Sequence, residues 1–177
     1  MNVMPAFEEL DPDNEEPAEK RPSMDPKGGV GGHAAMLAGY GLVVATISAV
    51  AAFTGKKLPG KMSTRDLAVT ALAAHKLSRT VTKDAVTSPL RAPFVDHDGD
   101  GGPGEVMESP KHEDGLRGSV GELLTCPFCF DVWALTALTA GRVFAPRVSG
   151  VSVDALAALA GADFLHLAYA KAQQAAG

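Results

Sequence analysis

An uncharged run of 20 residues, from Ala34 to Phe53, constrains the fold more than any other part of this 177-residue chain. As an α-helix it would rise about 30 Å, which matches the hydrocarbon core of a bilayer. Its many alanines, with Gly39 and Gly41, would let another helix approach closely, as interfaces inside membranes favour. The run predicts a transmembrane helix. The alternative is a buried helix of a soluble bundle, because alanine-rich spans are only weakly hydrophobic.

The N-terminal segment has a different composition. Residues 1–33 combine five prolines, a glycine run and eight acidic residues, which account largely for the net charge of -5. Such a segment buries too little apolar area to offset backbone ordering, so it predicts a disordered acidic tail without a secretory signal. No basic face with interleaved aromatic residues appears, so nucleic acid is not expected as a partner.

Further helices are predicted downstream of a basic connector, residues 55–65, which the positive-inside tendency would place in the cytoplasm. A second set of basic residues favours the opposite orientation, so both remain open: Lys83, Arg91, Lys111 and Arg117. Residues 66–83 follow a helical pattern, and they would span only if the charged side chains of their second half lie at an end or face other helices. An apolar helix is predicted from Phe130 to Ala145, and an alanine-rich one from Val153 to Gln173. If the last helix spans, its Asp163 is a candidate partner for Arg79.

Between these helices, residues 84–125 predict a long polar loop. Pro89 and Pro93 favour extended or turn backbone before them. Residues 96–101, Asp-His-Asp-Gly-Asp-Gly, match the opening of a calcium loop, but Met107 occupies the position of the bidentate glutamate, between Glu105 and Glu108. A flexible acidic loop is therefore the preferred interpretation.

Cys126 and Cys129 form a C-x-x-C motif that ends this loop. With Thr125 as a helix cap, both thiols would lie in the first helical turn, where the dipole favours a thiolate, so a redox pair is one interpretation. A zinc or iron site is another. Because it needs about four ligands, His97, His112, Asp131 or a second subunit would complete it. A structural role, with the thiols packed under Trp133 and Phe130, is the third.

Three motifs in order resemble the bacterial domain-of-unknown-function family 1360, over roughly Ala34 to Arg147. They are His75-Lys76-Leu77-Ser78-Arg79, then Lys83 to Phe94 with its two prolines, then Gly121 to Cys129 followed by Trp133. Some members carry sporulation or membrane labels, so the resemblance implies a membrane protein without naming an activity. The positions that match its pattern are Arg79, Asp84, Pro89, Arg91, Pro93, Phe94, Glu122, Cys126, Cys129 and Trp133. Their chemistry suggests that Arg79 or Arg91 pairs with Asp84 or Glu122 beside the cysteines.

These observations predict an all-α, multi-pass protein of the cell membrane, with three to four hydrophobic helices in residues 34–173 and a polar central loop. The expected role is structural, in assembly or in interaction, because no complete catalytic constellation is present. No cofactor is expected, and the expected partners are the lipid bilayer and either further copies or another membrane protein. The alternative is a membrane thiol-disulfide oxidoreductase or metal-binding protein that uses Cys126 and Cys129.

Overall fold

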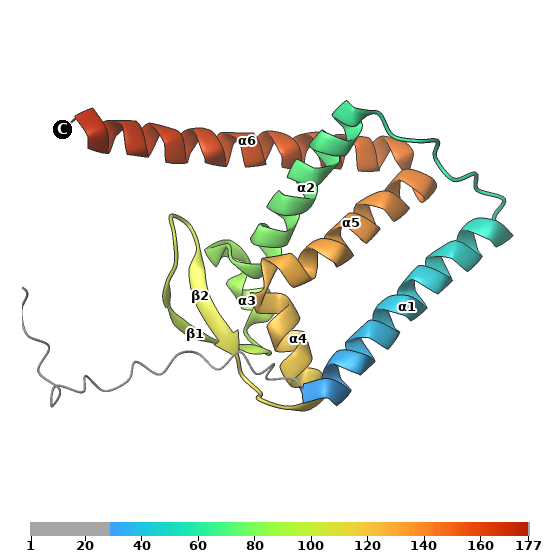
Figure 1. The fold of residues 1–177 in the computed structure, drawn as a ribbon, viewed down its shortest axis with the longest axis horizontal. Helices are drawn as coiled ribbons and strands as arrows, with labels where there is room; N and C mark the ends of the chain where they lie inside the picture. The colour runs from blue at the N-terminus through green and yellow to red at the C-terminus, as the bar shows by residue number, and fades with distance from the viewer. Residues whose placement is uncertain (1–28, 177) are drawn as a thin grey trace, which may run out of the picture.

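The computed structural model describes residues 29–176, which fold into six α-helices, a short 3₁₀-helix and one antiparallel pair of strands (Figure 1). The predicted tail, residues 1–33, therefore falls outside the described residues except for its last five. Those five begin α1 (Gly29–Phe53) instead. The helix starts earlier than expected because Gly32 is buried against the backbone of Gly115, a contact that a side chain would obstruct.

Two helices of the described region are long and apolar enough to cross a membrane, α1 and α6 (Pro146–Ala176). Only 6% of the apolar window of α1 and 17% of that of α6 is buried, so both helices present their apolar side chains outward. Helices α4 (Gly115–Thr125) and α5 (Pro127–Phe144) meet the same criterion only together, and they are bent by 85° where they join. The last part of α6 projects beyond the other helices (Figure 1).

The small core lies where α2 (Thr64–Thr82), α5 and α6 meet. Ser63 caps α2 by accepting a hydrogen bond from the backbone N–H of Asp66, at 3.2 Å, which confirms the helix predicted over residues 66–83. Small side chains on α2 allow close packing. The buried cluster consists of Ala73, Ala74, Leu138 and Val153.

Residues 84–125, predicted to be one long polar loop, instead contain a short helix, two strands and α4. The expectations of a loop and of an all-helical protein are therefore wrong here. After a 3₁₀-turn (Ala85–Thr87) and the short helix α3 (Ser88–Arg91), β1 (Val95–Asp100) pairs antiparallel with β2 (Val106–Pro110). We call residues 84–94 the proline segment and β1 with β2 the hairpin.

Turn chemistry explains why this region forms a hairpin rather than a flexible loop. The backbone N–H of Gly101 donates to the carbonyl of Glu105 at 2.9 Å, and Gly104 adopts a φ of 79°, which favours glycine. The acidic run of residues 96–101 accordingly forms most of β1 and the start of the turn after it. Its extended backbone differs from the predicted calcium loop, which would lie between two helices.

Helix α4 connects the hairpin to α1. A Cβ atom added at Gly121 would lie 2.9 Å from the carbonyl oxygen of Phe94, so α4 packs directly on the backbone beside β1. At the start of α1, Gly32 contacts Ser119 of α4, and His33 Nε2 lies 2.9 Å from Glu122 Oε2. The start of α1, the end of α2, the hairpin and α4 therefore gather at one end of the molecule, which we call the hairpin end (Figure 1).

Candidate functional site

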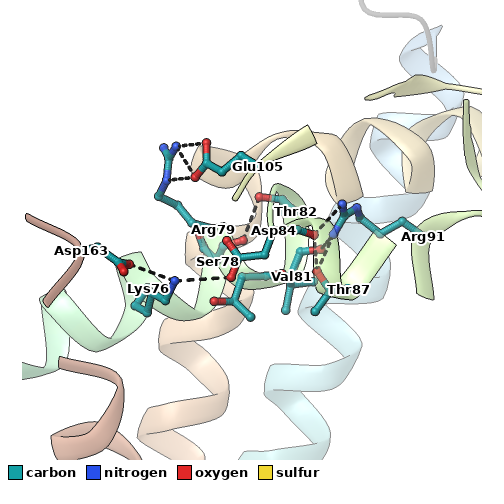
Figure 2. Close-up of polar contacts among 11 residues, drawn as sticks. Lys76, Ser78, Arg79, Val81, Thr82, Asp84, Thr87, Arg91, Glu105 and Asp163 are labelled. Atoms are coloured by element: carbon teal, nitrogen blue, oxygen red, sulfur yellow. Dashed lines mark hydrogen bonds and ion pairs between the residues drawn. The ribbon is translucent and has the colours of Figure 1, made fainter. Parts of the chain in front are cut away.

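Charged side chains from four parts of the chain meet at the hairpin end (Figure 2). The cations come from the second half of α2 and from the proline segment, and the carboxylates come from the proline segment, the hairpin and α6. We call this set the ion-pair cluster: Lys76, Arg79, Asp84, Arg91, Glu105, Glu108 and Asp163.

The centre of the cluster is a buried pair between Arg91 and Glu108. Arg91 Nε donates to Glu108 Oε2 at 2.5 Å, and the two side chains are only 1% and 2% exposed. Ser88 Oγ donates to the other carboxylate oxygen at 2.8 Å. A charge-assisted pair of this kind is favourable inside a protein only when the remaining polar atoms are also satisfied.

The remaining donors of Arg91 are satisfied by the proline segment and the end of α2. Nη1 donates to the carbonyl of Val81 at 2.8 Å and to Thr87 Oγ1 at 2.7 Å, while Nη2 donates to the carbonyl of Asp84 at 3.1 Å (Figure 2). The guanidinium thus connects the end of α2, the proline segment and, through Glu108, the hairpin. Its surroundings make it a fixed structural element.

The hairpin is also tied to the end of α2 through its backbone. The N–H of Val106 donates to the carbonyl of Lys83, and the N–H of Ala85 donates to the carbonyl of Gly104, both at 2.9 Å. These bonds set the register that places Glu105 and Glu108 opposite the arginines.

A second, more exposed pair joins Arg79 to Glu105. Arg79 Nε donates to Glu105 Oε1 at 2.9 Å, and Nη2 donates to Oε2 at 2.5 Å (Figure 2). The Arg79 side chain is 38% exposed, so water screens this pair more than the buried one.

Lys76 connects the cluster to the last helix. Its Nζ lies 2.9 Å from Asp163 Oδ2 on α6 and 3.4 Å from Asp84 Oδ2 (Figure 2). One ammonium group therefore holds carboxylates from two elements.

These contacts correct the predicted pairings. Arg79 and Arg91 pair with Glu105 and Glu108, rather than with the carboxylates of Asp84 or Glu122. Glu122 pairs with His33, and Asp163 pairs with Lys76 instead of Arg79. In the sequence, Glu105 and Glu108 are notable only as neighbours of Met107, which occupies the position of a calcium ligand. The Asp-Gly-rich run between the two short apolar pairs Phe94-Val95 and Val106-Met107 is the sequence signal that could have identified their hairpin.

The cysteine motif lies at the bend between α4 and α5. Cys126, rather than Thr125, caps α5, because its Sγ accepts the backbone N–H of Cys129 at 3.2 Å. Thr125 ends α4 and donates from Oγ1 to the carbonyl of Gly121 at 3.0 Å. Both thiols are free, and Cys129 is exposed. Ser78 Oγ of α2 donates to the carbonyl of Pro127 at 3.0 Å, which fixes the bend beside the cluster.

The remaining candidates lie apart from this motif or contact other elements. His97 lies on β1, and His112 follows β2. Across residues 29–176, no three His, Cys, Asp or Glu side chains are grouped so that they could hold a metal ion. Trp133 packs edge-on against Tyr40 of α1, with ring centroids 5.3 Å apart, and so anchors α5 to the first helix.

The fold and the cluster together define a mostly helical protein with two helices of membrane-spanning length and a hairpin held by ion pairs. Residues 69–169 match the family described as Protein of unknown function (DUF1360), and the chain belongs to that family. The match confirms the predicted resemblance, although it starts later and ends later than expected. It contains the whole ion-pair cluster and excludes α1. Curated proteins and solved structures gave no match to this chain.

Proposed function

We propose that the protein is a multi-pass protein of the cell membrane whose four long helices, α1, α2, α5 and α6, all cross the bilayer. If α1 crosses, it leads from the hairpin end to the connector. Helix α2 must then return, because its last residue precedes the segment bonded to the hairpin. This connectivity is the observation that carries the proposal.

The other two helices follow the same logic. Helix α5 starts beside α2 at the contact of Ser78 with Pro127, and it ends near the start of α2, where Arg142 Nη1 lies 3.4 Å from Thr70 Oγ1. Helix α6 returns to the hairpin end at the pair of Asp163 with Lys76. The charged half of α2 then faces protein and the polar end of the bundle, as charged residues in membranes require.

The exposed apolar side chains support this location. Most of these side chains lie on α1, α5 and α6. Extensive exposed apolar surface on a protein marks contact with a membrane or a partner. The exposed apolar residues of these helices include Leu37, Leu42, Val50, Phe53, Val132, Leu135, Val151, Leu159 and Leu167.

The connector is proposed to face the cytoplasm. Within the described part of the chain, Lys56, Lys57 and Lys61 form no ion pair. At the hairpin end, Arg79, Arg91 and Lys111 are paired, which leaves Lys83 and Arg117 as the unpaired cations among the described residues there. Short basic loops are retained on the cytoplasmic side. The hairpin end then lies outside.

Within this arrangement the protein has a structural, assembly or interaction role, with the bilayer and either further copies or another membrane protein as partners. The ion-pair cluster supports this role because its charges are fully engaged with one another, which suits a rigid platform. In this role, the ion-pair cluster holds the hairpin in place for contact with a partner.

Labelling of engineered cysteines tests the topology. In intact cells, Cys129 should react with a membrane-impermeant maleimide. A Lys57→Cys reporter, in a background with Cys126→Ser and Cys129→Ser, should react only after permeabilisation. If both positions are labelled from the same side, α2, which lies between them in the chain, does not cross and the proposal fails.

A thiol-disulfide oxidoreductase is the second candidate, because exposed Cys129 lies beside Cys126 at a helix start. Serine at both positions distinguishes the two roles. A structural role predicts that the variant forms the same chemically crosslinked species in membranes as the wild type. Loss of a thiol-transfer activity that the wild type possesses would favour the enzyme.

A further inference from the structure

A cavity of about 270 Å³ opens at the end of the bundle opposite the hairpin. It lies where α2 begins, α5 ends and α6 begins. Four charged residues line it, Arg65 and Asp66 from α2, Arg142 from α5 and Asp154 from α6. A cavity of this size, near the lower limit of ligand pockets, suits a small polar group.

The charges in this cavity differ from those of the ion-pair cluster. Within residues 29–176, no ion pair joins either arginine to either aspartate. Arg142 donates only to Thr70 Oγ1, at 3.4 Å, which holds its guanidinium against the α2 wall. Two cations and two anions therefore line one small cavity without pairing with one another. All four charges are available to form ion pairs with a ligand.

We propose that this cavity binds a phosphate ester that carries an ammonium group, supplied as the headgroup of phosphatidylethanolamine. The two guanidinium groups recognise phosphate, for which their planar donors are suited. The two aspartates recognise the ammonium group, which the headgroup of phosphatidylglycerol lacks. Val69 and Val153 add an apolar wall on which the lipid's glycerol backbone packs.

The position of the cavity supports a lipid as the source. It lies beside the basic connector, at the end where the proposed spans α1 and α2 meet the cytoplasmic surface of the bilayer. The lipid source rests on the proposed membrane location, whereas the phosphate and ammonium chemistry rests on the cavity alone.

Native mass spectrometry of the full chain in detergent tests the site, with phosphatidylethanolamine and phosphatidylglycerol as probes. The wild type should bind phosphatidylethanolamine about tenfold more tightly, since the second lipid lacks an ammonium group. Asp154→Asn should remove that preference, and Arg142→Gln should weaken both lipids about tenfold. Arg147→Gln, an exposed arginine that does not line the cavity, is the matched control and should change neither.

Equal wild-type affinity for the two lipids would overturn the proposal, as would equal effects of Arg142→Gln and Arg147→Gln. Asp154 is exposed, so its variant keeps the test valid if Arg142→Gln unfolds.

Titration with free phosphoethanolamine separates the sources, because binding of the free compound with no lipid binding would overturn the lipid source. Carbonate extraction of membranes reports the proposed location independently. An extractable protein that binds free phosphoethanolamine would overturn the location while the cavity chemistry stands.

Discussion

Arg91 and Glu108 form a buried ion pair with 2.5 Å between Nε and Oε2, and it joins the proline segment to the second strand of the hairpin. Neither element has an extensive apolar core of its own. The pair, with its surrounding hydrogen bonds, is therefore the main internal connection of the hairpin end.

Removal of one partner should strongly destabilise the protein. Glu108→Ala leaves the Arg91 charge buried without a counter-charge, which costs about 3–5 kcal/mol. Thermal unfolding of the purified protein in detergent measures the loss. Glu113→Ala, an exposed glutamate three residues beyond β2, provides the control and should change stability by less than about 0.5 kcal/mol. Equal melting temperatures for the two variants would contradict the role of the pair.

Removal of the outer pair should have a smaller effect. Arg79→Ala should cost about 1 kcal/mol, because the Arg79 side chain is partly exposed and screened by water. The difference from the wild type should shrink as salt is added, whereas the Glu108→Ala effect should persist, because buried pairs are screened less. Denaturant titrations at two salt concentrations check both statements, and a salt-independent Arg79→Ala effect would argue against them.

The contact of α4 with the hairpin predicts a steric effect. Gly121→Ala places a methyl group 2.9 Å from the Phe94 carbonyl oxygen and from Pro110 Cβ, so it should destabilise by about 1–3 kcal/mol. The matched control is Gly161→Ala on α6, where nothing lies within 4 Å of the added atom. That change should be neutral or raise the melting temperature through helix propensity. A tolerated Gly121→Ala would mean that α4 does not pack on the hairpin in this way.

Serine substitutions of the two cysteines at the bend between α4 and α5 should have different effects on stability. Cys126→Ser should raise stability by about 0.5–1 kcal/mol under reducing conditions, because a hydroxyl is a stronger helix cap than a thiol. Cys129→Ser should have no effect, since that side chain is exposed. Melting curves of the two single variants provide the comparison. A destabilised Cys126→Ser variant would show that Cys126 does more than cap α5.

The long helices could be predicted from the sequence because their apolar runs and capping residues are local signals. Ser63, a residue type that favours capping, caps α2, and α5 ends at Phe144, one residue before the predicted end at Ala145. The partners within the cluster could not be predicted in the same way. Glu108 lies 17 residues from Arg91, and Glu105 lies 26 residues from Arg79.

Those partners depend on strand register. A shift of one residue would turn Glu108 away from Arg91, and the irregularity between His97 and Gly99 moves the register within the hairpin. Gly99, which adopts a φ of 147° at that irregularity, is a local sign of a bulge, but it does not determine which residues of the two strands pair. The predicted pairing with Glu122 failed for a related reason, because His33 reaches Glu122 only when α1 begins within the glycine run.

The two contacts of Lys76 have a consequence for the order in which the chain is made. Asp84 leaves the ribosome shortly after Lys76, whereas Asp163 is synthesised only after α5 is complete. Lys76 thus has a nearby counter-charge during synthesis, before the last helix exists. The end of α2, the proline segment and the hairpin can therefore assemble from residues 76–110 first, and α6 then docks onto them through Asp163.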